Sequence, residues 1–189
     1  HDMIIRLDVA AAAREAGRTL LTARGFNPHT TVGVSPGAAY GNAKRWLPER
    51  FAESAARLGD QVMLFGSAGE RALCDTVAAH LRQAGVQAVH NAAGETSLRE
   101  FIEMVAACRV MLTNDSGAMH ISSALGVPTV TVFGATDHIA TGPTGPLARI
   151  VREPVECSPC LLRECPIDHR CMKAVTADRV VRTAQELLS

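Results

Sequence analysis

The chain has 189 residues, 47% of them hydrophobic, and equal numbers of basic and acidic side chains, a composition that suits one domain with a sizeable core. The resulting net charge of zero argues against a protein that binds nucleic acid or an anionic membrane with its whole surface, because such proteins carry a basic excess. We find no apolar run near the roughly 20 residues of a membrane span and no signal-peptide pattern, so we expect a cytoplasmic protein.

Strands and helices are expected to alternate along the chain. The Ala-rich stretch 3–24 predicts a helix that ends at Gly25. Short β-branched strands are expected at 31–35, 61–66, 86–89, 109–113, 129–133 and 150–151. Helices are expected from Pro48, around 73–81, from the capping box at 97–100, at 117–124 and at 176–188. In the helix that follows 97–100, we expect Leu98, Ile102 and Val105 to face inward.

This alternation predicts a single α/β domain whose parallel sheet is covered by helices on both faces. We divide it into a leading helix and linker at 1–30, the sheet, a Cys-rich loop at 152–175 and a terminal helix at 176–189. Ligands of such sheets bind beyond the carboxyl ends of the strands. Polar or Gly-rich segments follow the expected strands at 35–44, 66–70, 94–97, 113–120 and 134–143. The last could line a sugar pocket, although turn chemistry explains it as readily.

The segment from Ser35 to Trp46 joins a strand to a helix and is rich in small residues. Small residues let backbone amides approach an anion, and Lys44 could supply a charge to a phosphate. An ordinary Gly-rich loop with a solvated lysine is an equally good explanation. The segment matches neither the Walker pattern nor the dinucleotide fingerprint, so neither an ATPase nor a dehydrogenase is supported.

Glu70 follows the strand 61–66 within the sequence Phe-Gly-Ser-Ala-Gly-Glu. A carboxylate just beyond a strand end can accept hydrogen bonds from both hydroxyls of a ribose. An acidic residue in the first turn of a helix also interacts favourably with the helix dipole, and this structural role is the more frequent one.

The segment Thr-Asn-Asp-Ser-Gly-Ala-Met-His at 113–120 is the sharpest feature of the sequence. A strand leads into a helix whose first amides, those of Ser116 and Gly117, could bind a diphosphate. Asp115 could orient sugar hydroxyls, and His120 could donate to a phosphate oxygen. The alternative is that Asp115 or Ser116 caps the helix and that His120 packs on it.

Four of the six cysteines lie close together near the end of the chain. They are Cys157, Cys160, Cys165 and Cys171. In a reducing compartment such a cluster favours a structural zinc or iron site over disulfides. A disulfide-stapled loop and a reduced loop are together equally good explanations, and no base is paired with a thiol for catalysis. The other two cysteines, Cys74 and Cys108, are expected to be buried.

Taken in order, these segments resemble glycosyltransferase family 9, the heptosyltransferases of lipopolysaccharide core synthesis. The resemblance runs from about Val32 to the C-terminus. It rests on the segments 35–38, 44–46, 65–70, 93–98, 114–120 and 126–130. The Cys-Ser-Pro-Cys segment at 157–160, with Arg-Glu-Cys-Pro at 163–166 and Cys-Met at 171–172, resembles the type II enzymes most.

The resemblance implies the GT-B architecture, in which two Rossmann-like halves face each other across a cleft. The chain would be the C-terminal half, which binds ADP-heptose, and an N-terminal half that binds the lipopolysaccharide acceptor would be absent. In the family the activating carboxylate lies in the N-terminal half, so the resemblance implies that the isolated chain is inactive.

The implied reaction moves L-glycero-D-manno-heptose from ADP-heptose to the inner core with inversion and without a cofactor. It would take place in the cytoplasm at the inner membrane. The resemblance assigns the diphosphate to Lys44, Ser116 and Gly117, the ribose to Glu70 and the heptose to Asp115, with Ser35 and His120 as secondary candidates. The alternatives are another GT-B sugar-nucleotide enzyme, or a metal-binding or assembly module built on the cysteines.

Overall fold

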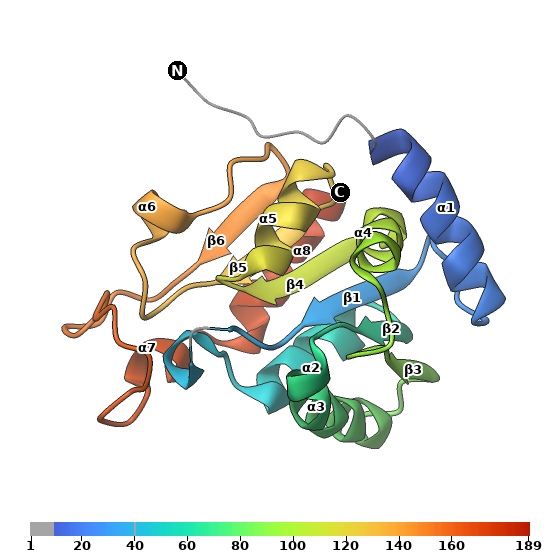
Figure 1. Cartoon of the computed structure of the whole chain (residues 1–189). Helices are drawn as coiled ribbons and strands as arrows, with labels where there is room; N and C mark the ends of the chain where they lie inside the picture. The colour runs from blue at the N-terminus through green and yellow to red at the C-terminus, as the bar shows by residue number, and fades with distance from the viewer. Residues whose placement is uncertain (1–9, 40) are drawn as a thin grey trace.

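The computed structural model describes residues 10–39 and 41–189, which build one six-stranded parallel sheet (Figure 1). The strands are β1 (Thr31–Ser35), β2 (Gln61–Leu64), β3 (Ala88–Asn91), β4 (Val110–Asn114), β5 (Thr129–Val132) and β6 (Ala148–Val151). Their order is β3-β2-β1-β4-β5-β6, and every neighbouring pair is parallel. The order therefore reverses between β1 and β4, which confirms the predicted Rossmann-like fold class.

Helices and short 3-10 turns connect the strands. The α-helices are α1 (Ala10–Ala23), α2 (Pro48–Leu58), α3 (Arg71–Gln83), α4 (Leu98–Ala107), α5 (Gly117–Ala124), α6 (His138–Thr141), α7 (Arg170–Lys173) and α8 (Ala177–Leu188). The 3-10 turns are η1 (Asn42–Lys44) and η2 (Ala68–Glu70). Within the described ranges, no helix combines the length and apolarity of a membrane span.

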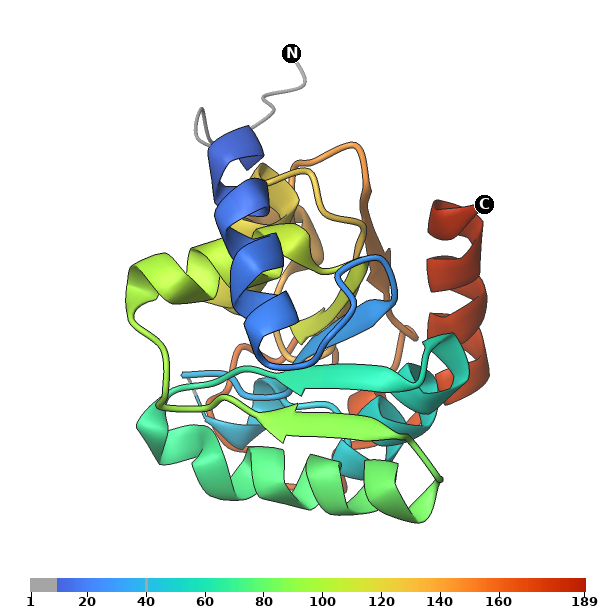
Figure 2. The ribbon, with the colours of Figure 1, turned by 90° about the vertical axis from the view of Figure 1, so that its right-hand side faces the viewer.

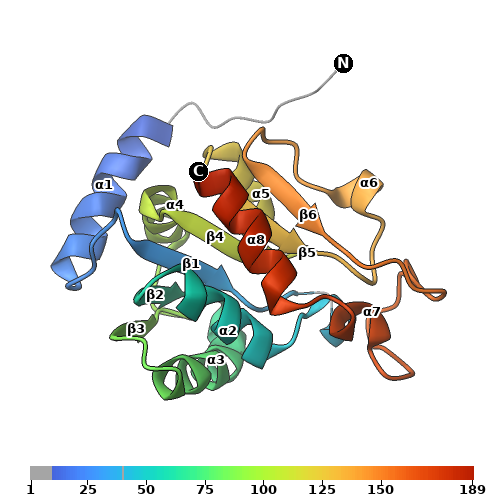
Figure 3. The ribbon, with the colours of Figure 1, turned by 180° about the vertical axis from the view of Figure 1, so that it is seen from behind.

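The helices cover both faces of the sheet. Figure 1 shows α4 and α5 in front of the sheet with α1 beside α4, and Figure 3 shows α2, α3 and α8 on the opposite face. Figure 2 views the sheet from the side, with α1 and α4 on one side and α8 on the other. Each face has its own apolar core: Phe51, Leu81 and Val181 belong to one, and Leu21 and Met104 to the other.

Local signals in the sequence explain most helix starts. Pro48 occupies the first turn of α2, where its missing N–H removes no helical hydrogen bond. Ser97 and Glu100 form the predicted capping box of α4, since each side chain bonds the other's backbone amide. Thr176 caps α8 by accepting a hydrogen bond from the amide of Arg179.

Three expectations from the sequence need correction or qualification. Leu98 does not face inward: it is the first residue of α4 and remains 69% exposed, whereas Val105 is buried. The strand expected at 86–89 lies two residues further on, because Val86 still closes the turn that ends α3. The first residues of the helix expected at 3–24 lie outside the described part of the chain.

Candidate functional site

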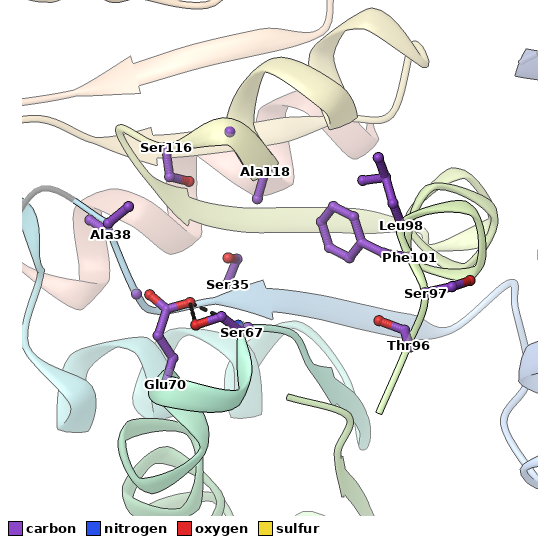
Figure 4. Close-up of a pocket in the computed structure, with 14 residues that line it drawn as sticks. Ser35, Ala38, Ser67, Glu70, Thr96, Ser97, Leu98, Phe101, Ser116 and Ala118 are labelled. Carbon is purple, nitrogen blue, oxygen red and sulfur yellow. Dashed lines mark hydrogen bonds between the residues drawn. The ribbon is translucent and has the colours of Figure 1, made fainter. Parts of the chain in front are cut away.

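A cavity of about 290 Å³ opens at the carboxyl ends of β1 and β4, where the strand order reverses (Figure 4). Parallel α/β sheets bind ligands at this point because the loops on either side diverge. The cavity is lined by Ser35, Gly37, Ala38, Ala39, Gly66, Ser67, Glu70, Thr96, Ser97, Leu98, Phe101, Ser116, Gly117 and Ala118. Four of the seven binding residues predicted from the sequence therefore lie around one space. They are Ser35, Glu70, Ser116 and Gly117.

Glu70 forms one wall of the cavity. One of its oxygens, Oε1, accepts hydrogen bonds from the amide of Ser67 at 2.9 Å and from the Ser67 hydroxyl at 3.2 Å. The helix-start role expected as an alternative is thus present, and the same carboxylate faces the cavity. Gly37 makes this approach possible, because a Cβ at that position would lie 1.8 Å from Glu70 Oε2.

The start of α5 forms the opposite wall, as Figure 4 shows for Ser116 and Ala118. Ser116 occupies the N-cap position, but its side chain makes no capping hydrogen bond and bonds the Asn114 carbonyl oxygen instead. Open space surrounds the Cα of Gly117, where a Cβ would meet nothing within 4 Å. The first turn of this helix can therefore present its amides and its positive dipole end to an anion.

Leu98 and Phe101 on α4 form an apolar wall that the sequence reading missed. The Phe101 ring packs edge-on against Phe65, with centroids 5.4 Å apart, which fixes its orientation. The capping box predicts where α4 begins, but it does not predict which side chains of the helix face a cavity. The sequence feature that could have located this wall is the segment 94–97, which lies just beyond the expected end of a strand.

Asp115 lies at the centre of a second group of side chains, which we call the Asp115 cluster. Lys44, Thr136 and Thr141 are its other members. Lys44 Nζ lies 3.5 Å from Asp115 Oδ2, and this oxygen also accepts hydrogen bonds from Thr136 at 2.6 Å and Thr141 at 3.1 Å. The side chains of Asp115 and Lys44 are only 6% and 18% exposed, so their attraction is weakly screened by water. Because Asp115 directly precedes Ser116, the cluster adjoins the cavity.

Asn114 ties the loops around the cavity together. Its side-chain oxygen accepts a hydrogen bond from the amide of Trp46 at 2.9 Å, and its side-chain nitrogen donates to the carbonyl oxygens of Pro36 at 2.7 Å and Gly37 at 3.4 Å. Asn114 is fully buried at the end of β4. No separate role was predicted for Asn114 within the segment 113–120.

His120 is exposed on α5 and does not line the cavity. The structure thus brings six of the seven predicted binding residues to the cavity or the adjoining Asp115 cluster and leaves His120 outside both. Its role towards a phosphate stays a prediction.

The four clustered cysteines, Cys157, Cys160, Cys165 and Cys171, line a separate small cavity of about 60 Å³. Their thiols are free, and among the described residues no group of three or more His, Cys, Asp or Glu side chains is placed to hold a metal ion. Burial raises the pKa of the Cys171 thiol, and the neighbouring Cys157 adds to the shift.

Cys74 and Cys108 are buried, as predicted. Burial raises the pKa of both thiols to about 12, and the negative charge of Glu70 adds to the shift at Cys74. Both are therefore inert members of the core.

Residues 6–170 match the model of glycosyltransferase family 9 (heptosyltransferase). The chain belongs to glycosyltransferase family 9. Among curated family members, it is 33% identical over 167 residues to lipooligosaccharide heptosyltransferase 2 of Campylobacter jejuni, a match that covers 86% of the chain and 52% of the relative. It is 40% identical over 124 residues to lipopolysaccharide heptosyltransferase 2 of Escherichia coli K12, which covers 64% and 36%.

The fold also resembles a solved structure of the family. ADP-heptose lps heptosyltransferase II of E. coli superimposes with a TM-score of 0.79 at 31% identity, covering 97% of the chain and 53% of that structure. These comparisons confirm the predicted resemblance to type II heptosyltransferases. The chain spans about half the length of the Campylobacter jejuni relative and of the solved E. coli structure.

Proposed function

We propose that the chain is the C-terminal, donor-binding half of a heptosyltransferase that uses ADP-L-glycero-D-manno-heptose. The observation that carries the proposal is the cavity at the reversal between β1 and β4, where Glu70 faces the uncapped start of α5 beside the Asp115 cluster. Its chemistry fits an adenosine diphosphate that carries a sugar, and family membership supports this choice of ligand.

The adenosine would lie between Glu70 and α4. Glu70 Oε1 already accepts two hydrogen bonds from Ser67, so a ribose hydroxyl would use mainly Oε2. The apolar surfaces of Leu98 and Phe101 suit the flat face of a purine base. Ser35, at the end of β1, is a secondary contact on the floor of the cavity.

The diphosphate would lie at the start of α5. The amides of Ser116 and Gly117 and the helix dipole offer fixed positive charge, and Lys44 adds a full charge beside them. These groups stabilise the charge that develops on the leaving ADP, so in this proposal the transfer needs no cofactor.

The heptose would be held by Asp115. Lys44, Thr136 and Thr141 all contact Oδ2 of this carboxylate, and in this proposal Oδ1 accepts hydrogen bonds from sugar hydroxyls. Exposed His120 on α5 is a secondary candidate for a phosphate contact.

In this proposal, the rest of the reaction belongs to an N-terminal half of the full protein. A heptose hydroxyl of the lipopolysaccharide core attacks the anomeric carbon, the bond from this carbon to the phosphate oxygen breaks with inversion, and ADP leaves. A carboxylate of the N-terminal half takes the hydroxyl proton. Because the acceptor is a membrane lipid, we propose that the full protein works in the cytoplasm at the inner membrane, and that this chain alone does not turn over.

Titration of the chain with ADP and, in parallel, with UDP tests the proposal. We expect millimolar ADP to raise the melting temperature, because a ligand that binds only the folded state stabilises it, and UDP to have a smaller effect. A shift with UDP and none with ADP would favour another GT-B sugar-nucleotide enzyme. Release of ADP from ADP-heptose with a core acceptor, catalysed by this chain alone, would contradict the division of labour between the halves.

A second candidate is a metal-binding or assembly module built on the four clustered cysteines, because their thiols line one cavity. In the present arrangement no three of these thiols are placed to hold a metal ion. Metal analysis of protein prepared under reducing conditions decides: stoichiometric zinc or iron that is lost in Cys157→Ser supports this candidate, and folded metal-free protein eliminates it.

A further inference from the structure

The Cys-rich loop at 152–175 touches the segment that carries Lys44. Ala43, the residue before Lys44, is bonded to this loop through both of its backbone groups. Its amide donates to the Arg163 carbonyl oxygen at 3.0 Å, and its carbonyl oxygen lies 3.1 Å from His169 Nε2. The loop passes so close that a Cβ at Gly41 would lie 2.3 Å from the Arg163 oxygen. The backbone that presents Lys44 is thus held from outside its own turn.

The same loop also touches the segment that carries Thr136. The amide of Leu161 donates to the Ala135 carbonyl oxygen at 2.7 Å, and the Ser158 hydroxyl donates to the Gly134 carbonyl oxygen. Thr136 directly follows these two residues and donates to Asp115 Oδ2. Lys44 and Thr136 both contact Asp115, and each directly follows backbone that is bonded to the Cys-rich loop.

The backbone of the loop is unusual at these contacts. Leu161 and His169 are the non-glycine residues with positive φ in the described part of the chain, at 61° and 57°. A positive φ is uncommon for a side chain such as that of Leu161 and persists where surrounding contacts enforce it, whereas His is among the residues that adopt it more readily. Both residues make one of the bonds to the donor-site segments.

We propose that the Cys-rich loop is a positioning element of the donor site, which sets Lys44 and Thr136 against Asp115 by holding Ala43 and the 134–135 backbone. This inference rests on the proposed function, because it assigns the loop to the diphosphate and sugar side of the same site. It gives the loop a role that requires no metal.

The test removes one bond of the loop and measures ADP binding to the 189-residue chain by calorimetry. His169→Asn keeps a residue that tolerates positive φ, but its side chain is too short to reach the Ala43 carbonyl oxygen. We expect ADP affinity to fall about fivefold, in keeping with the loss of one supporting hydrogen bond. Lys173→Ala, an exposed change in the same loop, is the matched control and should leave the affinity unchanged.

A double-mutant cycle separates positioning from general damage to the fold. If the loop acts through Lys44, His169→Asn should weaken ADP binding by less than about twofold when Lys44→Ala is already present. An equal loss in both backgrounds overturns the inference, as does unchanged binding in the single variant. Should His169→Asn fail to fold, Ser158→Ala combined with Thr136→Val runs the same cycle on the other contact. Absence of ADP binding by the unaltered chain instead overturns the proposed function, and this inference with it.

Discussion

The two neighbouring parts of the candidate site are held in different ways. At the cavity, Glu70 is fixed by Ser67, three residues away along the chain. In the Asp115 cluster, Asp115 is bonded by Thr136 at a separation of 21 residues, and the segment before Lys44 is bonded by His169 at a separation of 126 residues. The cavity wall at Glu70 depends on one local turn, so it forms whenever the neighbouring strand and helix form. The Asp115 cluster forms only when three segments that are distant in sequence are all in their native positions. Changes far from the ligand should therefore affect the cluster more than the cavity.

The largest effect is expected for Asn114→Ala, because this buried side chain joins both parts. The change removes three hydrogen bonds and leaves the amide of Trp46 and the Pro36 carbonyl oxygen without their partner. We expect a loss of about 2–4 kcal/mol in the free energy of unfolding, measured by urea denaturation. Gln87→Ala, an exposed amide on the connection to β3, is the control and should cost less than about 0.5 kcal/mol. Equal stability of the two variants would contradict a joining role for Asn114.

Lys44→Ala is expected to act on ligand binding more than on the fold. Removing one largely buried charge beside a diphosphate should weaken ADP binding about tenfold, which corresponds to about 1.4 kcal/mol. Isothermal calorimetry gives the dissociation constants, and adenosine, which has no phosphate, serves as the control ligand with an unchanged affinity. Unchanged ADP affinity would remove Lys44 from the site.

Gly37→Ala tests the cavity wall without touching the Asp115 cluster. The new Cβ would overlap Glu70 Oε2, and the carboxylate would have to move away from its place against Ser67. We expect the melting temperature to fall by about 2–4 °C, because weakening one capping interaction costs about 1 kcal/mol, together with ADP affinity reduced about threefold through the displaced carboxylate. A large loss of stability with normal binding would reverse this assignment.

The smallest effect concerns the cysteines of the core. Because burial raises the pKa of Cys74 and Cys108 to about 12, almost none of either thiol is ionised at pH 8, and only the thiolate is reactive. A thiol reagent at pH 8 should modify the partly exposed Cys157, Cys160 and Cys165 and leave the two core thiols unmodified until the protein unfolds. Mass spectrometry of the modified peptides checks this order, and early labelling of Cys74 would contradict the buried core.

Labelling the same loop thiols also sharpens the comparison between the two parts of the site. If the Cys-rich loop holds the Asp115 cluster, modified protein should lose ADP affinity and keep its affinity for adenosine. Equal loss for both ligands would indicate that the loop supports the whole site rather than one part of it.

The sequence predicts well the features of the fold and the site that depend on neighbouring residues. Strand ends, the Pro48 helix start and the Ser97–Glu100 capping box are set by neighbouring residues, so they are confirmed at or near the expected positions. The location of Glu70 and of the start of α5 at the cavity follows from the same logic, because both lie in segments that come after strands whose carboxyl ends meet at one edge of the sheet. Their roles towards a ligand stay predictions.

The long-range half could not be predicted in this way. Nothing in the spacing of Thr136, Thr141 and Asp115 indicates that two hydroxyls and a lysine share one carboxylate oxygen. The direction of Leu98 also depended on packing, because the first residue of a helix is free to face solvent or a cavity. The cysteine spacing suggested a metal, whereas the contacts of the loop come from its backbone and from Ser158 and His169.

The outer strands of the sheet, β3 (Ala88–Asn91) and β6 (Ala148–Val151), are only four residues long. An exposed strand edge is a template on which other chains can add strands and aggregate, and short edges with charged side chains resist this. His90 on β3 is bonded to Glu95, and Arg149 on β6 is exposed. Addition of a strand from another chain at either edge of the sheet is thereby disfavoured.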